Sequence, residues 1–321
     1  MAGLILSLLL CLMMLYCLSS RANAVAAVTI FPSWLWLFAG LLFLAFSFHR
    51  HATRGFRYLA LITGVLWLIY LVTFVEEPRS MIRAVLRHPS QTTGQMLRVV
   101  TLNCAGGSSA AAAEVARFHP DIILWQEIPS PPEIRRLTKK ILGPRAEVVM
   151  GLDTAIAARG RVEAQMLPRE MQRFCAQARV HFSDGREMAV ASLHLMTPPL
   201  RVDLWSPDCW KSQSQQRQIQ REQLQSIGTR LAKISTTMPV IVGGDFNMPQ
   251  GDAVLRLLQP RLQDSFRLGG LGWGDTITNE FPLLRIDQIW VSSAFTVRGV
   301  RAYHTRYSDH RMVVCDLILR Q

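Results

Sequence analysis

Uncharged apolar residues are concentrated in three runs at the start of the chain, whereas the remainder alternates between short apolar and polar stretches. The runs extend over Leu4–Ser19, Val25–Phe48 and Tyr58–Val75. A membrane-spanning helix needs roughly 20 apolar residues. The second run meets this length, and the third does so together with its flanks. The pattern therefore predicts a transmembrane region over residues 1–75 with two or three spanning helices.

The first run fits two kinds of segment, a spanning helix or a cleaved signal peptide. Ala22-Asn23-Ala24 resembles the small-residue site at which signal peptides are cleaved. The three residues before the run include no Lys or Arg, which counts against cleavage. Both interpretations leave the two later runs in the membrane.

The charges beside the apolar runs predict how the chain crosses the membrane. The linker after the second run holds three arginines, Arg50, Arg54 and Arg57. The linker before that run holds only Arg21. Short cytoplasmic loops are enriched in Lys and Arg, so we expect the second linker in the cytoplasm and everything after Val75 outside it, as in an integral protein of the cell or inner membrane. Three further arginines favour the opposite orientation: Arg79, Arg83 and Arg87.

After the apolar runs the sequence is typical of a globular domain. Residues 76–95 are polar and predict a partly helical tether, so the domain is placed at 96–321. Leu97–Leu102 is an apolar strand that ends at Asn103. Asp121–Trp125 is a second strand, which brings Glu127 to its C-terminal end. An Ala-rich helix is predicted between these two strands.

The rest of the domain mixes hairpins with helices. Asp184-Gly185 separates two β-type runs, Gln172–Phe182 and Glu187–Leu195, which predicts a hairpin. Gln215–Ile234 has apolar residues at helical spacing. Val240–Val242 is a buried strand that Gly243 and Gly244 are expected to end. Further strands are predicted at 147–150, 154–158, 285–291, 295–303 and 312–319. Interleaved helices and hairpins predict a layered α/β (α+β) sandwich with mixed sheets.

The composition narrows the partners only slightly. The formal net charge is +12 and the sequence pI is about 10.1, which favours polyanions or anionic lipids. Membrane proteins with arginine-rich loops share this charge balance. The six cysteines have no CxxC spacing, which argues against a structural zinc site. Cys104 and Cys315 adjoin apolar strands and are predicted to be buried thiols.

Polar side chains recur where apolar strands end or within them. They are Asn103, Glu127, His194, Asp245, Asn247, Asp287, Asp309 and His310. Asp245 and Asn247 follow the central strand two residues apart, and such a pair suits a polarised water or a phosphate oxygen. Carboxylate and amide oxygens are the ligands that Mg²⁺ or Mn²⁺ prefers. The set predicts hard-metal chemistry without a protein nucleophile.

The order of these motifs resembles the endonuclease/exonuclease/phosphatase superfamily, the fold of deoxyribonuclease I. The matching segments from about Leu97 onward are VVTLN, LWQE, SLHL, GGDFN, RIDQIW and SDH. The resemblance implies a four-layer α/β/β/α sandwich with two mixed sheets and a metal-dependent phosphoesterase activity. It also implies a phosphate-ester substrate, either nucleic acid or a phospholipid headgroup; no protein partner is evident.

The resemblance also implies a role for each residue. Glu127 is the principal metal ligand, and Asn103 and Asp309 position the metal or its waters. Asp245 orients or deprotonates the attacking water, and Asn247 holds the phosphate. The remaining residues handle protons or charge: Asp287 and His310 as a hydrogen-bonded pair, and His194 as the group that stabilises the transition state or protonates the leaving oxygen. Ala105 stands where some relatives have a second acidic ligand, which favours one dominant metal site.

Three functions stay open on the sequence. A membrane-anchored nuclease is slightly favoured by the basic charge and by His194. A phospholipid or sphingomyelin phosphodiesterase fits the membrane region. A non-catalytic, membrane-anchored binding module is the third, although it would not need the complete set of Glu127, Asp245 and His310. No carboxylate partner for His194 can be placed from the sequence.

Overall fold

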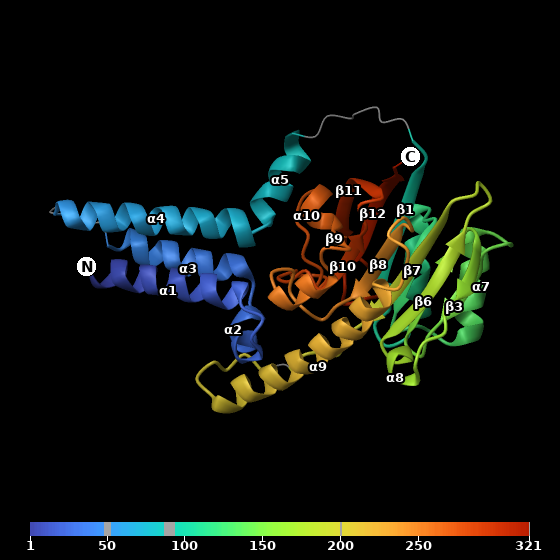
Figure 1. Cartoon of the computed structure of the whole chain (residues 1–321), viewed down its shortest axis with the longest axis horizontal. Coiled ribbons are helices and arrows are strands. Elements are labelled where there is room, and N and C mark those ends of the chain that lie inside the picture. Colours follow the sequence, from blue (N-terminus) through green and yellow to red (C-terminus); the bar gives the residue numbers. More distant parts are fainter. Residues whose placement is uncertain (48–52, 87–93, 200, 321) are drawn as a thin grey trace.

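The computed structural model describes residues 1–47, 53–86, 94–199 and 201–320. A group of apolar helices extends to one side of a sandwich of two β-sheets (Figure 1). Two of the arginines beside the apolar runs lie outside the described residues, namely Arg50 and Arg87.

Two N-terminal helices are long and apolar enough to cross a membrane: α1 (Ala2–Ser19) and α4 (Arg54–Phe74). The second apolar run was predicted to be a span, and in the structure it is divided by a bend, so it counts as a third span only if the bent pair crosses the membrane as one broken helix. It forms η1 (Asn23–Val25), α2 (Ala26–Thr29) and α3 (Ser33–Ala45), with a bend of 73° between α3 and the helices before it. Pro32 lies at the bend. It interrupts the helix because it has no N–H to donate and because it disfavours helical geometry in the residue before it.

Hydrogen bonds and close packing hold α1, α3 and α4 together. The Trp67 indole donates to Ser7 Oγ at 3.0 Å, and Ser7 Oγ donates to the Gly40 carbonyl at 2.8 Å. A Cβ at Gly40 would lie 1.8 Å from the Trp67 ring, so only glycine allows this approach.

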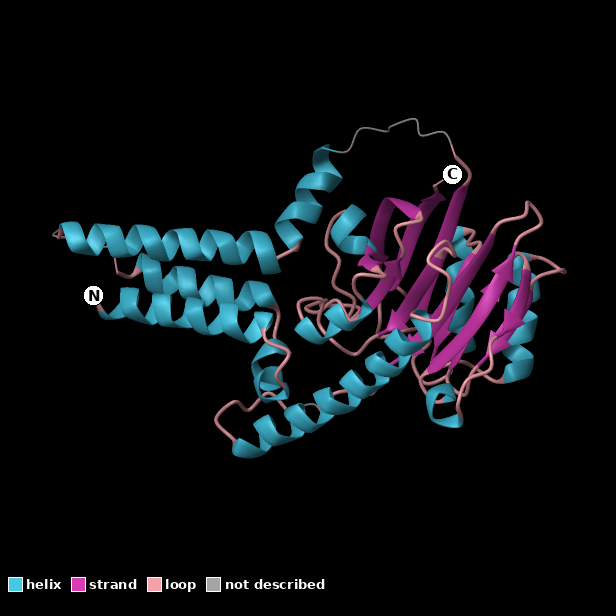
Figure 2. Cartoon of the chain, viewed as in Figure 1, coloured by secondary structure: helices cyan, strands magenta, loops and turns pink. Residues whose placement is uncertain are grey.

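The sandwich consists of two six-stranded sheets (Figure 2). The first has the order β11 (Phe295–Tyr303), β12 (Met312–Leu319), β1 (Met96–Asn103), β2 (Ile122–Gln126), β4 (Thr154–Ala158), β3 (Glu147–Met150). The second has the order β5 (Arg161–Ala164), β6 (Cys175–His181), β7 (Glu187–His194), β8 (Val240–Asp245), β10 (Asp287–Val291), β9 (Gln263–Asp264). Strand β1 is parallel to β2 and β7 is parallel to β8, whereas their other pairings are antiparallel. Both sheets are mixed, as predicted.

Helices cover the outer face of each sheet. Helices α6 (Ser109–Glu114), η2 (Val115–Phe118) and α7 (Pro131–Leu142) lie on the first sheet, and α9 (Pro207–Leu231) and η3 (Ala253–Leu258) lie on the second. Between the sheets, residues such as Val99, Ile241 and Ile289 form a separate core. The short helices α8 (Arg169–Gln172) and α10 (Ser265–Gly269) complete the domain. The four-layer α/β/β/α prediction is confirmed.

Several predicted boundaries differ from the observed ones. The strand expected from Gln172 begins at Cys175, because Pro168 starts the short helix α8. Helix α9 begins at Pro207 rather than Gln215, since proline is accommodated in a first helical turn. Strand β8 continues through both glycines to Asp245. A Cβ at Gly244 would lie 2.0 Å from the Leu193 carbonyl, so Gly244 permits close strand pairing rather than ending the strand.

The segment predicted as a tether is helical in part and contacts the sandwich. Helix α5 (Glu77–Leu86) carries Arg83, whose guanidinium donates to the carbonyls of Phe266, Arg267 and Gly270. Glu76, just before α5, accepts a hydrogen bond of 2.7 Å from Arg285. The last apolar helix is therefore joined to the domain by buried polar contacts as well as by the chain.

Candidate active site

The alternation of side chains along the strands decides which polar residues meet. In β8, Ile241 belongs to the core between the sheets, whereas Val240 and Val242 face the helices. Asp245 is four residues beyond Ile241, so it also points between the sheets. The same parity applies to Asp287, two residues before Ile289 in β10. The inner faces therefore become polar at one end of the sandwich.

Strand register aligns three of these residues in the second sheet. Asp245 pairs with Asp287 in the antiparallel neighbour and with His194 in the parallel neighbour. Asp245 and Asp287 are buried, and His194 has 13% of its side chain exposed. The three side chains thus lie in one row across β10, β8 and β7.

The first sheet supplies an amide and a carboxylate opposite this row. Asn103 Nδ2 donates to Glu127 Oε1 at 3.0 Å and to Asp245 Oδ2 at 3.1 Å, which links the two sheets. The Gly106 N–H donates to the other oxygen of Glu127. These hydrogen bonds lower the pKa of Glu127 although burial acts in the opposite direction. Glu127 has a φ of 47°, a left-handed conformation that is uncommon outside glycine and turns its side chain toward Asn103.

His310 and Asp287 form the expected pair. His310 Nδ1 lies 2.9 Å from Asp287 Oδ2, and its Nε2 lies 3.9 Å from Asp245 Oδ2. Burial opposes the charge on His310, but Asp287 and Asp245 outweigh it and raise its pKa to about 10. The imidazole is therefore protonated at neutral pH. Burial and the neighbouring Asp287 raise the pKa of Asp245 to about 6.

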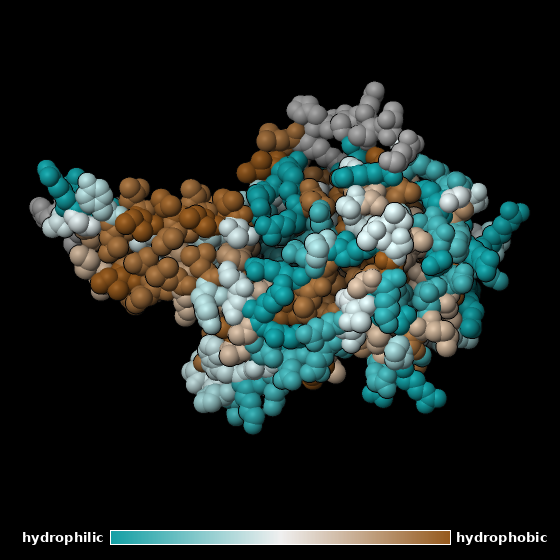
Figure 3. Space-filling model, viewed as in Figure 1, coloured by the Kyte–Doolittle hydropathy of each residue, from teal (hydrophilic) through white to brown (hydrophobic). Residues whose placement is uncertain are grey.

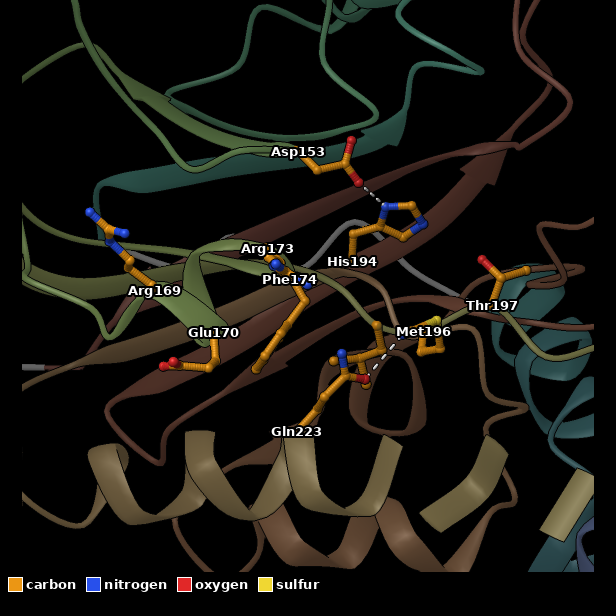
Figure 4. A pocket seen from close by; sticks show the side chains of 10 residues that line it. Asp153, Arg169, Glu170, Arg173, Phe174, His194, Met196, Thr197 and Gln223 are labelled. Atoms are coloured by element: carbon orange, nitrogen blue, oxygen red, sulfur yellow. Dashed lines mark hydrogen bonds and ion pairs between the residues drawn. The ribbon is translucent and has the colours of Figure 1, made fainter. Parts of the chain in front are cut away.

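His194 has a carboxylate partner that the sequence did not reveal. Its Nδ1 contacts Asp153 Oδ2 (Figure 4). Its Nε2 lies 3.7 Å from Asp245 Oδ2 and 3.9 Å from Glu127 Oε1. Asp153 precedes β4, which runs antiparallel to β2 and pairs Thr154 with Gln126. The start of an antiparallel strand lies at the same edge of the sheet as the end of its neighbour. The position of Asp153 just before β4 could therefore have indicated that it lies near the site.

The remaining two predicted residues lie at the edges of the site. Asn247 Nδ2 donates to the Leu195 carbonyl at 2.9 Å, and its backbone N–H donates to Asp245 Oδ1 at 2.8 Å. Asp309 is exposed, and its charge is among those that raise the pKa of His310. Ser308 beside it donates to the Asn103 carbonyl at 2.7 Å, which fixes this loop against β1.

The donors present fit an oxygen-preferring divalent cation. Three carboxylates, those of Glu127, Asp245 and Asp287, face two imidazoles, and one oxygen of Asp287 is buried without a hydrogen-bond partner among the described residues. Ligand atoms of Asp245, Asp287 and His310 lie within 4.8 Å of one another. The hydrogen bond between His310 Nδ1 and Asp287 Oδ2 contributes to this closeness. Glu127, one third exposed, is the open carboxylate.

A cavity of about 580 Å³ adjoins His194. Its lining includes Asp153, Phe174 and Gln223, together with the exposed arginines Arg169 and Arg173 (Figure 4). Glu170 also lines the cavity, so its lining carries charges of both signs.

The chain is similar in sequence to one protein family and in structure to several solved proteins. Residues 100–310 match the model of the Endonuclease/Exonuclease/phosphatase family, while no curated protein sequence matches the chain. A mannosyl-6-phosphatase of Bacteroides thetaiotaomicron is 18% identical with a TM-score of 0.55, over 70% of this chain and 100% of that one. D. rerio TDP2, complexed with a single-strand DNA product, is 17% identical with a TM-score of 0.51, over 70% and 99%. Beta toxin of Staphylococcus aureus is 14% identical with a TM-score of 0.53, over 68% and 99%. These likenesses show the fold.

Proposed function

Since this chain belongs to the endonuclease/exonuclease/phosphatase family, we propose that it is a membrane-anchored phosphodiesterase that depends on Mg²⁺ or Mn²⁺. The observation that carries the proposal is the Asn103 amide, which bridges Glu127 of one sheet and Asp245 of the other. This bridge supports the proposal because it keeps the carboxylate proposed as metal ligand close to the carboxylate proposed as base.

Each polar residue has a chemical role in this proposal. Glu127, with Asn103 and Asp309, would hold the Mg²⁺ or Mn²⁺ ion, which polarises phosphoryl oxygens when bound. Asp245 aims the attacking water and accepts its proton. Asn247 binds the phosphate from the side of Leu195.

The two histidines handle the charge that develops during hydrolysis. Protonated His310, oriented by Asp287, donates from Nε2 to a phosphoryl oxygen. His194 protonates the leaving oxygen, and Asp153 on Nδ1 holds its ring so that Nε2 faces the reaction.

Nucleic acid is the favoured substrate. Arg169 and Arg173 beside His194, together with the net charge of +12, provide partners for phosphates on either side of the cleaved bond. A phospholipid headgroup is the second candidate, favoured by the attachment of the domain to apolar helices.

We further propose that residues 1–75 are inserted in the membrane and that residues 96–321 form the catalytic domain outside the cytoplasm. The two helices that fit a span support the insertion. A cytoplasm-only fluorescent reporter fused to the C-terminus tests the orientation, and a bright signal would contradict it.

Hydrolysis of bis-(p-nitrophenyl) phosphate by the purified full chain tests the activity. We expect turnover with Mg²⁺ or Mn²⁺, none with EDTA, and a loss of about 10²–10⁴-fold in His310→Ala, because a positioned proton donor contributes that much. Plasmid DNA and sphingomyelin liposomes then rank the natural substrates.

Arg136→Ala is the control, since this residue pairs with Glu133 on the exposed face of α7. Absence of metal-dependent turnover, or full activity in His310→Ala, would leave the non-catalytic binding module as the better description.

A further inference from the structure

A second cavity, of about 760 Å³, lies where the last apolar helix meets the sandwich. One wall comes from Thr73 and Phe74 at the end of α4, and the opposite wall comes from β9, η3 and α10. Its volume falls in the range of ligand pockets, roughly 300–1,000 Å³. None of its lining residues lines the cavity beside His194, so the two sites are separate.

Positive charge in this cavity is not neutralised by its own acids. Three acidic residues line it, Glu76, Asp252 and Asp264. Glu76 and Asp264 both accept hydrogen bonds from buried Arg285, and Asp252 accepts one from buried Arg217. Three arginines also line the cavity: Arg79, Arg256 and Arg267.

These arginines have no ion-pair partner within the described part of the chain. The Arg256 guanidinium donates to the Ser19 carbonyl, at 3.4 Å. One terminal nitrogen of Arg79 is buried and has no hydrogen-bond partner among the described residues. A buried guanidinium N–H without an acceptor is costly, so the site favours an anionic oxygen.

The surface of α4 leads to this cavity. Ile62, Val65 and Ile69 are 54%, 47% and 49% exposed, and with Thr73 they are spaced three, four and four residues apart. Residues at this spacing share one face of a helix. An apolar stripe therefore runs along the helix and ends at Thr73, on the cavity wall. In Figure 3 hydrophilic residues of the sandwich adjoin the brown surface of the apolar helices.

We propose that this cavity binds the phosphate of an anionic phospholipid whose acyl chains lie along α4. Arg79 and Arg267 contact the phosphate, and the stripe from Ile62 to Ile69 contacts the chains. Guanidinium groups next to an exposed apolar helix face suit a phosphate that carries acyl chains. The inference rests on the proposed membrane insertion, and it is independent of the hydrolase activity.

Native mass spectrometry of the detergent-solubilised full chain tests this site, because it resolves single bound lipids. We expect one phosphatidylglycerol adduct that binds at least tenfold more tightly than phosphatidylcholine or inorganic phosphate. In the double variant Arg79→Gln/Arg267→Gln its affinity falls about tenfold or more, since two charge-assisted hydrogen bonds are lost.

The matched control is Arg135→Gln/Arg145→Gln, which removes the same charge from exposed positions on and after α7. It should bind like the parent, as should His310→Ala, and Arg79→Lys/Arg267→Lys should recover part of the affinity. Unchanged binding in the double glutamine variant, at an unchanged melting temperature, would refute the site. Inorganic phosphate binding as tightly as the lipid would refute a lipid as the source of the phosphate.

Discussion

Two groups of buried charges in the described part of the chain differ in how the charge is balanced. At the junction with α4 and α5, Arg285 lies between Glu76 and Asp264, at 2.7 and 2.6 Å. In the candidate active site, Asp245 and Asp287 face each other across two strands, and His310 is bonded to only one of them. Arg285 at the junction is neutralised by its two acidic partners, whereas the carboxylates of the candidate active site outnumber its imidazoles.

Buried charged side chains can therefore either hold elements of the fold together or form a site that binds or reacts. Paired and hydrogen-bonded charges hold two elements in one arrangement, and removing one partner leaves an uncompensated charge. Carboxylates forced together keep a raised pKa, as Asp245 does, and such groups are typical of sites that bind or react. Arg285 and Asp287 are two residues apart, so one short segment joins both clusters.

The largest expected effect separates activity from stability. Asp245→Asn should lower turnover by about 10²–10⁴-fold, because the base that receives the proton is lost. Its melting temperature at pH 8 should be no lower than that of the parent, because the variant also removes repulsion from Asp287. Thermal unfolding gives the melting temperature, and hydrolysis of bis-(p-nitrophenyl) phosphate gives the turnover. A large fall in the melting temperature would show that Asp245 stabilises the fold, as the buried charges of the junction do.

Arg285→Met is expected to lower the stability of the fold, in contrast to Asp245→Asn. It leaves Glu76 and Asp264 buried without their guanidinium, and we expect a loss of about 3–5 kcal/mol in the free energy of unfolding. The control is Arg98→Met, which breaks the partly exposed pair with Asp316 and should cost about 1 kcal/mol or less. Chemical unfolding followed by fluorescence gives both values, and equal costs would contradict a special role for the junction.

The smallest effect concerns Asp275, a buried acid beside the junction. Burial and Glu77 raise its pKa to about 8, so between about pH 4 and 8 the folded chain binds a proton that the unfolded chain releases. Stability therefore falls as the pH rises through this window. Asp275→Asn should flatten the dependence of melting temperature on pH between 5 and 7.5. Parallel profiles for the variant and the parent would show that Asp275 titrates normally.

Much of the fold could be predicted from local patterns. Apolar runs and turn residues located most strands, including the hairpin around Asp184-Gly185 that joins β6 and β7. The bend at Pro32 could have been anticipated as well, because proline inside an apolar run interrupts a helix. The early start of α9 could not, since Pro207–Gln215 is polar and carries no apolar stripe.

The candidate site was predictable as a set of residues but not as a geometry. Order and residue type pointed to Asn103, Glu127, Asp245 and His310. Nothing local joined Asp153 to His194, because they are 41 residues apart, one just before β4 of the first sheet and the other at the end of β7 in the second. The contact depends on how the two sheets pack against each other.

The sequence by itself determined the apolar helices, the layered sandwich and the identity of the polar residues at strand ends, because these depend on periodicity and side-chain chemistry. Only the tertiary structure decided that Glu76 meets Arg285, that three arginines surround a cavity at the end of α4, and that Asn103 bridges the sheets. Such contacts arise from packing between distant segments, and no pattern within a single segment encodes them.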